Sequence, residues 1–376
     1  MKKIFILVNV DWFFISHRLC LAEEALKDGW EVYAAAGDTG RSKEIENTGI
    51  TYFPLPMSRS GMNIFNELKT FRQIYTLYNK IKPDVVHQVA LKPIVYGSFI
   101  AKTINIKGVL NSFSGLGYVF TDNRKSIAQS LIIKLMKYSF KRPNTQFIFQ
   151  NKDDFLELSN FGIFNESNMI NFIKGSGVDL KKFSFVPQPS NSKIQILFAA
   201  RMLLDKGIDE LRRATELLKD RYFQKVTFIL AGMIDEENKA GVSESYLLDW
   251  ADNSYVKWIG FQKDMISLVS SSDIVVLPSY REGMPKSLIE ACAIGRPIVT
   301  TNVIGCRECV IEGENGFLVP IKSYVELAEK LEILILNKAM RVSMGANSRK
   351  KAEEEFGLKK VVNKHLEIYS DLLEKV

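Results

Sequence analysis

The sequence is poor in the features that would mark a cross-linked, membrane-spanning or fibrous protein. Only 4 of its 376 residues are cysteine, too few and too unevenly spread for a disulfide framework, which predicts a reduced, cytoplasmic protein. No apolar run approaches the ~20 residues of a membrane-spanning helix. The apolar run Ile4 to Val8 is too short for a signal peptide and no small-residue cleavage site follows it. With 46% hydrophobic and 25% charged residues, the chain has the composition of a soluble globular protein.

Acidic residues are scarce in one part of the chain. Residues 58–142 carry 14 Lys and Arg against 3 Asp and Glu, a net charge of +11. Residues 1–187 as a whole have a net charge of +8, whereas the remainder has −1. This concentration favours an anionic partner: a nucleic acid, a phosphate ligand or an anionic membrane surface. The alternative is a basic surface that only aids solubility.

Short apolar runs alternate with helical patterns along the whole chain. Most of these runs do not alternate with polar residues, which is typical of strands covered on both faces of a parallel sheet. The chain length suits two domains, and the proline-containing segment 185–192 is the best linker. We therefore predict an α/β protein with two facing, doubly wound Rossmann-like parallel-sheet domains, residues 1–187 and 188–357. A C-terminal helix over 358–376 could pack on either domain. The predicted strands are Lys3–Val10, Glu31–Ala36, Thr51–Leu55, Asp84–Val89, Gly108–Asn111, Thr145–Gln150, Met169–Ile173, Gln195–Ala200, Val226–Ala231, Val256–Ile259, Asp273–Pro278, Pro297–Thr301 and Phe317–Pro320.

The segment after the predicted strand 273–278 carries two carboxylates in a loop and the helix that follows it. Ligands of open α/β sheets bind at the carboxyl ends of the strands, so this loop is a candidate site. A glycine at 283 allows close backbone approach, and the start of the helix near Lys286 offers N–H groups to an anion. Glu282 and Glu290, with seven residues between them, suit sugar or ribose hydroxyls. The alternatives are a solvated Glu282 and a pair between Glu290 and Lys286, one turn apart.

The segment EGMPKSLIEACAIGRPIVTTNVIGCRE resembles the donor-site signature of retaining glycosyltransferase family 4. DWFFISHRL, FSGLGYVF and ARMLLDKGIDE also resemble that family, so the resemblance covers essentially the whole chain. It is strongest to bacterial members that extend polyprenyl-diphosphate-linked sugars in capsule, O-antigen or glycan-precursor assembly. The resemblance implies the GT-B fold and a retaining hexosyltransferase. The donor would be a nucleotide-diphosphate sugar, such as a UDP-sugar, and hexose or N-acetylhexosamine would pass to a lipid-linked sugar acceptor.

The resemblance assigns donor contacts to residues that follow the strands of the second domain. Arg201 and Lys206 would neutralise the diphosphate leaving group, although Lys206 could also be a solvated side chain. Glu282 would hold the donor sugar and Glu290 the ribose. Phe261 fits the position that meets the nucleobase, or it is a core residue. The remaining donor-binding positions are Gly283, Met284, Pro285, Lys286 and Ser287. No Asp-x-Asp pair follows a strand, so we expect no catalytic metal and no cofactor.

The acceptor would bind the basic first domain. His17 and Arg18 follow the first strand, and Arg59 and Lys92 follow the third and fourth strands. By the resemblance, Arg59 and Lys92 match basic positions of the lipid-acceptor members, and their cations would suit a pyrophosphate. The resemblance also makes the loop containing Ser114 and Gly115 a substrate loop. His87 lies within a strand and is expected to be a hydrogen-bonded core histidine.

Residues 124–142 combine an apolar stripe with many basic side chains. This pattern favours a helix at an anionic leaflet, so we expect peripheral association with the inner face of the cytoplasmic membrane. The alternative is an ordinary surface helix whose apolar stripe packs on its own sheet. Cys306 and Cys309 have Cys-x-x-Cys spacing, but a structural zinc needs four ligands and no second Cys or His pair exists. We interpret the spacing as a coincidence in a loop.

Other classes of function are less well supported. The alternative is a two-domain sugar- or nucleotide-binding protein without transferase activity. A sugar-binding protein of periplasmic type would need a secretion signal and would have no use for an Arg/Lys clamp for a diphosphate. A nucleic-acid binder is suggested by charge alone, without an aromatic–basic repeat, a zinc pattern or a helix-turn-helix signal. A nicotinamide dehydrogenase is disfavoured because no Gly-x-Gly-x-x-Gly follows the first strand.

Overall fold

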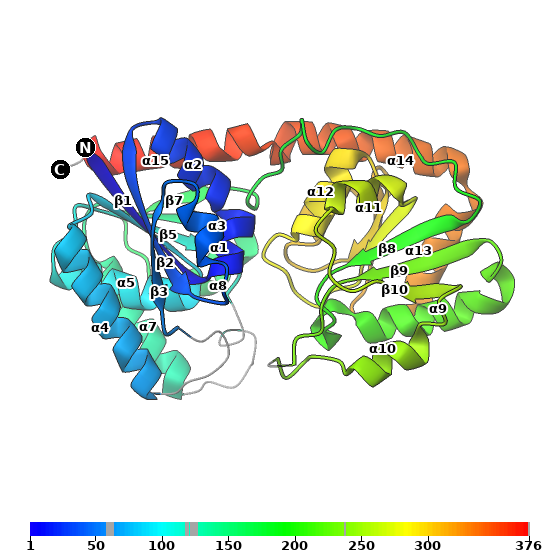
Figure 1. Cartoon of the computed structure of the whole chain (residues 1–376), viewed down its shortest axis with the longest axis horizontal. Coiled ribbons are helices and arrows are strands. Elements are labelled where there is room, and N and C mark those ends of the chain that lie inside the picture. Colours follow the sequence, from blue (N-terminus) through cyan, green and yellow to red (C-terminus); the bar gives the residue numbers. More distant parts are fainter. Residues whose placement is uncertain (58–63, 117–119, 121–126, 237, 375–376) are drawn as a thin grey trace. The chain divides into compact units, whose positions relative to one another are not determined.

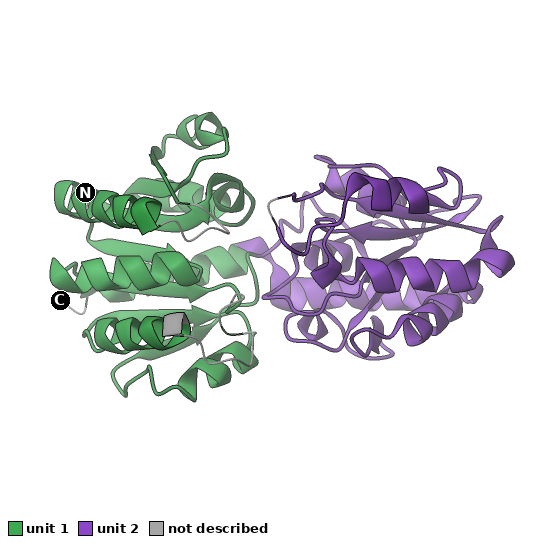
Figure 2. Cartoon of the chain, turned by 90° about the horizontal axis from the view of Figure 1, so that it is seen from below, with its two compact units in different colours: residues 1–176, 359–376 green, residues 177–358 purple. Residues whose placement is uncertain are grey.

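The chain folds into two compact units, each built on one parallel sheet with helices on both faces (Figure 1). The computed structural model describes residues 1–57, 64–116, 120, 127–236 and 238–374. The first unit contains Met1–Ser176 and Lys359–Val376, and the second contains Gly177–Leu358 (Figure 2). The predicted α/β class, with two Rossmann-like units, is confirmed.

The first unit has a seven-stranded sheet in the order β3-β2-β1-β4-β5-β6-β7, with every neighbouring pair parallel. Every residue of β4, β5 and β6 is buried, because helices cover both faces of the sheet. The strands are β1 Lys2–Val10, β2 Trp30–Gly37, β3 Thr51–Leu55, β4 Val85–Val89, β5 Gly108–Phe113, β6 Thr145–Phe149 and β7 Met169–Phe172. The helices are α1 Asp11–His17, α2 Leu19–Lys27, α3 Ser42–Glu46, α4 Ile64–Ile81, α5 Leu91–Thr103, α7 Ile127–Phe140, α8 Lys152–Ser159 and α15 Leu358–Glu374, which starts at the last residue of the second unit.

The second unit has a six-stranded parallel sheet in the order β10-β9-β8-β11-β12-β13. Its strands are β8 Ile194–Ala199, β9 Val226–Ala231, β10 Val256–Trp258, β11 Ile274–Leu277, β12 Ile298–Thr301 and β13 Gly316–Val319. Its helices are α9 Ile208–Tyr222, α10 Glu244–Trp250, α11 Met265–Ser271, α12 Lys286–Ile294, α13 Tyr324–Leu336 and α14 Lys338–Lys351. Shorter helical segments are η1 Leu204–Lys206, η2 Arg307–Cys309 and η3 Ala352–Phe356.

All thirteen predicted strands are present, and their ends differ from the predicted ends by no more than two residues. Buried parallel strands are continuous apolar runs, which is why the sequence pattern finds them.

The units divide between Ser176 and Gly177, earlier than the boundary at 187/188 that the sequence predicts. Residues 177–187 belong to the second unit because their backbone bonds to it. The Val178 N–H donates to the Phe356 carbonyl at 2.8 Å, and the Val186 N–H donates to the Ile294 carbonyl at 3.0 Å. The buried Arg296 guanidinium donates to the carbonyls of Val186 and Pro187 at 3.0 and 3.2 Å. The two prolines therefore lie on the surface of one unit and do not separate the two.

Helix α15 completes the core of the first unit. The Tyr369 hydroxyl bonds to Nδ1 of His87 at 2.7 Å, and Ser112 Oγ bonds to its Nε2 at 2.7 Å. His87 is fully buried with both nitrogens bonded, so the prediction of a core histidine is confirmed. Burial lowers the pKa of His87 well below its usual value, and burial lowers the pKa of His365 on α15 to about 3. Both rings are therefore neutral at pH 7.

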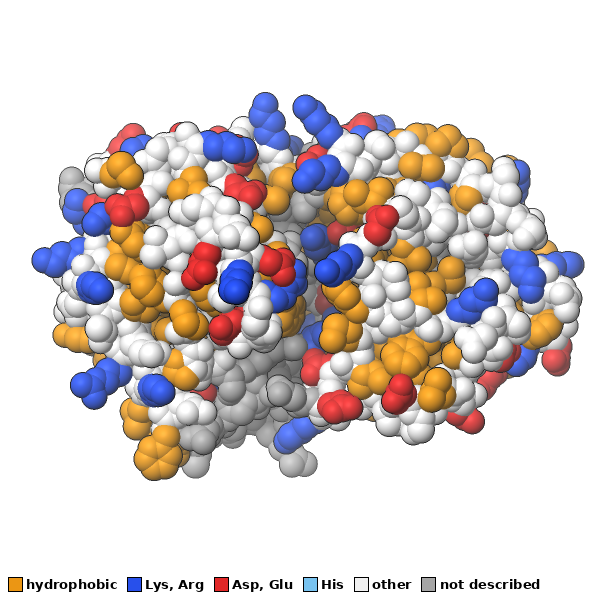
Figure 3. Space-filling model, in the orientation of Figure 1, with side chains coloured by type: hydrophobic (Ala, Val, Ile, Leu, Met, Phe, Trp, Pro, Cys, Tyr) orange, Lys and Arg blue, Asp and Glu red, His pale blue; other side chains and the backbone are white. Residues whose placement is uncertain are grey.

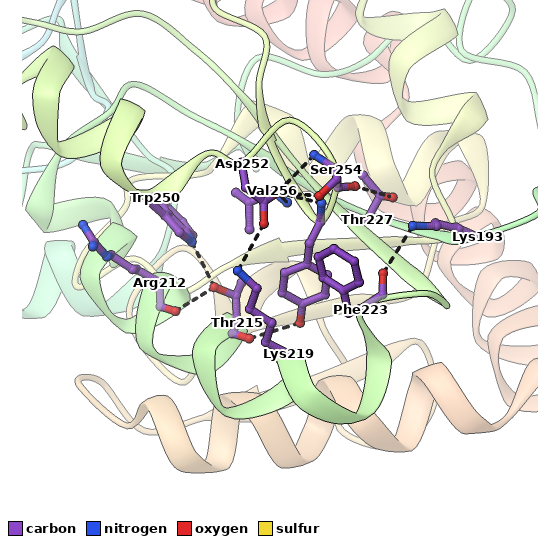
Figure 4. Close-up of polar contacts among 11 residues, drawn as sticks. Lys193, Arg212, Thr215, Lys219, Phe223, Thr227, Trp250, Asp252, Ser254 and Val256 are labelled. Atoms are coloured by element: carbon purple, nitrogen blue, oxygen red, sulfur yellow. Dashed lines mark hydrogen bonds and ion pairs between the residues drawn. The ribbon is translucent and has the colours of Figure 1, made fainter.

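A polar network fixes helix α9 to the turn before β10 (Figure 4). One oxygen of Asp252 accepts the backbone N–H groups of Ser254, Tyr255 and Val256 at 3.0, 2.7 and 3.1 Å. The other accepts Nζ of Lys219 on α9 at 3.1 Å. Burial raises the pKa of Asp252, but these hydrogen bonds outweigh it and hold the pKa well below its usual value. The carboxylate thus positions α9, whose first residue follows the loop that carries Lys206.

We expect Asp252→Ala to lower the free energy of unfolding by about 1–3 kcal/mol at pH 7, because it leaves several N–H groups without their acceptor. Since folding lowers the pKa of this carboxyl group, its contribution is complete above about pH 4 and declines as the pH falls further. Denaturant unfolding at pH 7 and pH 3 measures the difference between wild type and variant.

Asp249→Ala is the matched control, because Asp249 forms an exposed pair with Arg212 and accepts no turn N–H. A deficit of Asp252→Ala that is equal at pH 7 and pH 3 would contradict the assignment of the stabilisation to the charged carboxylate.

Candidate functional site

The strand order of the second sheet reverses between β8 and β11, and ligands of such sheets bind beyond the carboxyl ends of the strands at this point. The loop after β8 contains Arg201 and Lys206. The loop after β11 contains Glu282 and Gly283 and leads into α12. The structure therefore brings the predicted donor residues to one edge of one sheet.

The two loops are joined through their backbones. The Tyr280 N–H donates to the Asp205 carbonyl at 2.9 Å, and Ser279 Oγ donates to the same carbonyl at 3.1 Å. Gly207 has φ 72°, and a Cβ added there would lie 2.0 Å from the Pro278 carbonyl oxygen. Only glycine permits this approach, so the loop after β8 rests directly on the end of β11.

A side-chain bond adds to this backbone junction. The Tyr280 hydroxyl donates to Oε1 of Glu210, in the first turn of α9, at 2.7 Å. Burial, followed by the bond to this carboxylate, raises the pKa of Tyr280. The start of α9 and the loop that carries Glu282 are thereby held together.

Both predicted cations form ion pairs at this edge. Lys206 Nζ pairs with Glu282 Oε1, and their side chains are 18% and 14% exposed. Arg201 Nη1 pairs with Oδ2 of Asp235 in the loop after β9. Asp235 is not among the predicted site residues, although its position a few residues beyond a predicted strand is a signal that could have identified it. These two cations and two carboxylates sum to zero charge.

The start of α12 carries the second carboxylate of the signature. Glu290 is 5% exposed, and its Oε1 lies 3.6 Å from Lys286 Nζ, so the pair that the sequence left as an alternative does form. Burial raises the pKa of Glu290, and Lys286 opposes that shift. Pro285 is the N-cap and no side chain caps the helix, while Met284 is buried and Ser287 lies in the first turn.

The loop after β12 contacts the backbone of Glu282. The Glu282 N–H donates to the Ile304 carbonyl at 3.2 Å. Gly305 has φ 83°, and a Cβ there would lie 2.4 Å from the Glu282 carbonyl oxygen. The loop after β12 therefore holds the backbone of Glu282, and Lys206 in the loop after β8 pairs with its side chain.

Phe261 and the Cys-x-x-Cys segment differ in exposure. Phe261 is 57% exposed, which excludes the core alternative, while its contact with a nucleobase remains a prediction. Cys306 and Cys309 are buried, and burial raises the pKa of Cys306 to about 12. This environment is the opposite of the exposed, low-pKa thiol that redox chemistry needs. Among the described residues, no group of three or more His, Cys, Asp and Glu side chains could hold a metal ion.

The first unit places the predicted acceptor residues at the ends of β1, β4 and β5. The His17 ring stacks on Phe13 with centroids 4.2 Å apart, and its Nδ1 lies 2.6 Å from Ser16 Oγ. Lys92 Nζ pairs with Glu67 Oε1 at 2.7 Å, and both side chains are largely buried.

The remaining predicted acceptor residues are Ser114, Gly115 and Arg59. Ser114 and Gly115 follow β5 and are half-buried, and Gly115 has φ 108°. Arg59 lies outside the described residues.

Arg18, which the sequence predicts as an acceptor contact, lies in the interior of the first unit. It is 3% exposed, its Nη1 donates to the His17 carbonyl at 2.8 Å, and burial lowers its pKa to about 10. Its charge acts on His87, His365 and Tyr369, so it belongs to the polar cluster beneath α15. The sequence pattern could not show this, because the helix that buries Arg18 comes from the far end of the chain.

A polar hollow of about 260 Å³ lies elsewhere in the second unit. Its lining residues come from the segment before β8 and from the strands of that edge: Asn191, Ser192, Lys193, Gln195, Thr227, Ile229 and Lys257. Most of them precede or begin the strands, so the hollow is separate from the site at the carboxyl ends.

Two family models match most of the chain. The model described as "Glycosyl transferases group 1" matches residues 180–351, and "Glycosyl transferase 4-like" matches residues 3–151. A Campylobacter jejuni N,N'-diacetylbacillosaminyl-diphospho-undecaprenol α-1,3-N-acetylgalactosaminyltransferase is 28% identical, covering 94% of each chain. An Escherichia coli UDP-Gal:α-D-GlcNAc-diphosphoundecaprenol α-1,3-galactosyltransferase is 23% identical over 89% of this chain and 88% of its own. Among solved structures, Anabaena Alr3699/HepE in complex with UDP has a TM-score of 0.79 and 16% identity, covering 99% of this chain and 100% of its own.

The contact between Gly207 and Pro278 predicts the effect of adding a side chain at Gly207, and Gly313 serves as the control. Gly313 has φ 77° with no atom near the added Cβ, so we expect Gly313→Ala to destabilise the protein by about 1–2 kcal/mol through backbone conformation alone. Gly207→Ala should cost about 1–3 kcal/mol more, because its Cβ collides with a carbonyl oxygen. Chemical denaturation measures both. Equal losses would show that the loop yields to the methyl group without cost.

Proposed function

The chain is a glycosyltransferase of family 4 with the GT-B fold, and we propose that it moves a hexose or N-acetylhexosamine from a nucleotide-diphosphate sugar to a lipid-linked sugar in bacterial surface-glycan synthesis. The observation that carries the donor half is the position of two ion pairs, Arg201 with Asp235 and Lys206 with Glu282, at the reversal of the second sheet. The alternative is a sugar- or nucleotide-binding protein without transferase activity, and a sugar-binding protein would have no use for two cations at a phosphate.

The donor half works through charge and position. Arg201 and Lys206 neutralise the charge that develops on the diphosphate as the bond to the sugar breaks. The start of α12 adds backbone N–H donors for an anion from Gly283, Met284, Lys286 and Ser287, and Pro285 is the N-cap that sets where the helix begins. Glu282 holds hydroxyls of the donor sugar, Glu290 the ribose, and the exposed Phe261 the base. A UDP-sugar is the proposed donor, supported by the E. coli relative's name and by UDP in the Anabaena structure.

We propose that transfer proceeds with retention, and the same arrangement supports this. The carboxylate at the proposed sugar position, Glu282, is paired with Lys206, which suits a hydroxyl-binding group better than a covalent nucleophile. We therefore propose that the acceptor hydroxyl attacks the face from which the diphosphate departs. Both curated relatives are named as enzymes that make α-1,3 links.

The acceptor half belongs to the basic first unit. A polyprenyl-diphosphate-linked sugar would bring a pyrophosphate to the carboxyl ends of β1, β4 and β5, near His17, Lys92, Ser114 and Gly115. The names of both curated relatives specify undecaprenyl-diphosphate-linked sugars. Lys92 would exchange its pair with Glu67 for the phosphate. Nucleic acid is not a proposed partner.

Arg201→Ala and Lys206→Ala should each lower turnover by about 10²–10³-fold, the usual effect of losing one electrostatic donor to a transition state. The measurement is transfer from radiolabelled UDP-sugars to a polyprenyl-diphosphate-linked sugar. Arg221→Ala, which removes an exposed cation paired with Glu332, is the matched control and should keep full turnover.

Near-normal turnover in both site variants would contradict the diphosphate assignment. The wild-type assay is also run in EDTA, because we propose that the two cations neutralise the charge of the leaving group without a metal ion. Activity that disappears in EDTA and returns with Mg²⁺ or Mn²⁺ would mean that a metal ion carries this role.

Membrane association is proposed from the helices on one side of the first unit. Along α7, Met136 and Phe140 are fully buried, so this part of the apolar stripe packs on the core of the first unit, whereas Leu131 is 57% exposed. Lys134, Lys137 and Lys141 remain exposed. Ile64, Phe65 and Leu68 at the start of α4 are 72%, 83% and 63% exposed, and Figure 3 shows hydrophobic and basic side chains together over this side of the unit.

The proposed attachment is therefore electrostatic and peripheral, on the inner face of the cytoplasmic membrane. No helix within the described part of the chain is long and apolar enough to span a bilayer. Each Lys or Arg near an anionic surface contributes about 1 kcal/mol, screened beyond a Debye length of about 8–10 Å.

Replacement of Lys134, Lys137 and Lys141 by Glu should abolish most sedimentation with anionic liposomes at low salt, because it reverses three exposed charges. The wild-type protein should sediment at low salt and be released at high salt. Replacement of Lys263, Lys338 and Lys350 by Glu makes the same change of net charge on the second unit and should leave sedimentation intact. Equal loss in both triple variants would mean that net charge, not this face, governs binding.

A further inference from the structure

Arg201, Lys206, Asp235 and Glu282 form two ion pairs at the carboxyl edge of the second sheet, called here the four-charge cluster. The proposed function gives a role to each of them except Asp235. Asp235 lies in the loop after β9, its side chain is 18% exposed, and it pairs with Arg201, whose side chain is 33% exposed. Glu282, by contrast, pairs with Lys206 and has the donor sugar as its proposed ligand. Asp235 therefore pairs with one of the two cations that are proposed to bind the phosphates, and the role of this pair is not yet explained.

The backbone places Asp235 beside Arg201. The Met202 N–H donates to the Met233 carbonyl at 3.0 Å, and the Leu204 N–H donates to the Ala240 carbonyl at 2.7 Å. A Cβ on Gly232 would lie 1.8 Å from the Ala200 carbonyl oxygen, so the end of β9 touches the residue before Arg201. The loop after β9 is thus bonded on both sides of Asp235 to the loop that carries Arg201.

We propose that the Asp235 carboxylate is the counter-ion of Arg201 in the free protein and that the diphosphate of the donor displaces it from Arg201 on binding. The proposal rests on the proposed function, because it takes a nucleoside diphosphate as the ligand of this edge. A diphosphate that approaches the cluster meets two cations already neutralised by two carboxylates. Binding must exchange the Asp235 carboxylate for a phosphate on Arg201, and the displaced carboxylate then lies near an anion.

The exchange limits how tightly the site holds a diphosphate. A site with two unpaired cations would retain the nucleoside diphosphate product as strongly as it attracts the donor, and product release sets the turnover of many enzymes. Asp235 provides a carboxylate that competes with the product for Arg201. Its removal should therefore strengthen product binding and product inhibition without raising turnover.

Isothermal calorimetry with UDP and with uridine tests the proposal. Asp235→Asn should lower the dissociation constant for UDP by about 3- to 30-fold, since it removes a partly buried ion pair and a repulsion. The dissociation constant for uridine, which has no phosphate, should not change. Glu236→Gln removes the neighbouring exposed carboxylate and is the matched control, with no change for either ligand.

A double-mutant cycle with Arg201 separates this role from a structural one. In the Arg201→Ala background, Asp235→Asn should strengthen UDP binding by a clearly smaller factor than in the wild type, because the cation it competes for is absent and only the carboxylate–phosphate repulsion is left to remove. Asp235→Ser is the second substitution at the position, and thermal denaturation checks that each variant is folded. Weaker UDP binding in folded Asp235→Asn and Asp235→Ser would overturn the proposal and make Asp235 a residue that positions Arg201. A wild-type protein that binds none of UDP, GDP and ADP would overturn the donor assignment itself, and this proposal with it.

Discussion

Three glycines at the carboxyl edge of the second sheet allow backbones to meet at distances that exclude any side chain. A Cβ on Gly207, Gly232 or Gly305 would lie 2.4 Å or less from a carbonyl oxygen of the neighbouring loop. These contacts join the loops after β8, β9, β11 and β12 into one layer. Arg201, Lys206, Asp235 and Glu282 are held by that layer, so the electrostatics of the site depend on it.

The charges of the two units suit different tasks. In the second unit the two site cations, Arg201 and Lys206, are paired with carboxylates, and its half of the chain has a net charge of −1, so the proposed recognition of a diphosphate would depend on exchange between partners. The first unit carries the excess positive charge on exposed helices and at strand ends. A diffuse basic field of this kind acts on extended anionic surfaces, whereas paired charges act on a ligand of defined shape.

The first unit also contains a buried polar cluster that depends on the last helix of the chain. Arg18, His87 and Tyr369 lie together with His365 beneath α15, and burial keeps both histidines neutral at pH 7. Arg18 donates to the carbonyl of His17, so the cluster touches the backbone of a proposed acceptor residue. The charge of Arg18, which acts on His365 and Tyr369 of the final helix, is thereby held at the backbone of His17.

The strands, the parallel sheets and the loops of the candidate site could be predicted from the sequence, since buried parallel strands are apolar runs and the loops at their carboxyl ends follow directly in the chain. The candidate donor residues Arg201, Lys206 and Glu282 could also be predicted, from a signature within one loop and a short motif in another. Three features became evident from the fold alone: Asp235 pairs with Arg201, Arg18 lies in the interior, and residues 177–187 belong to the second unit. These outcomes depend on which strands are neighbours and on where α15 packs. A local pattern contains neither, because the residues that meet are separated by 34 positions for Arg201 and Asp235 and by far more for Arg18 and α15.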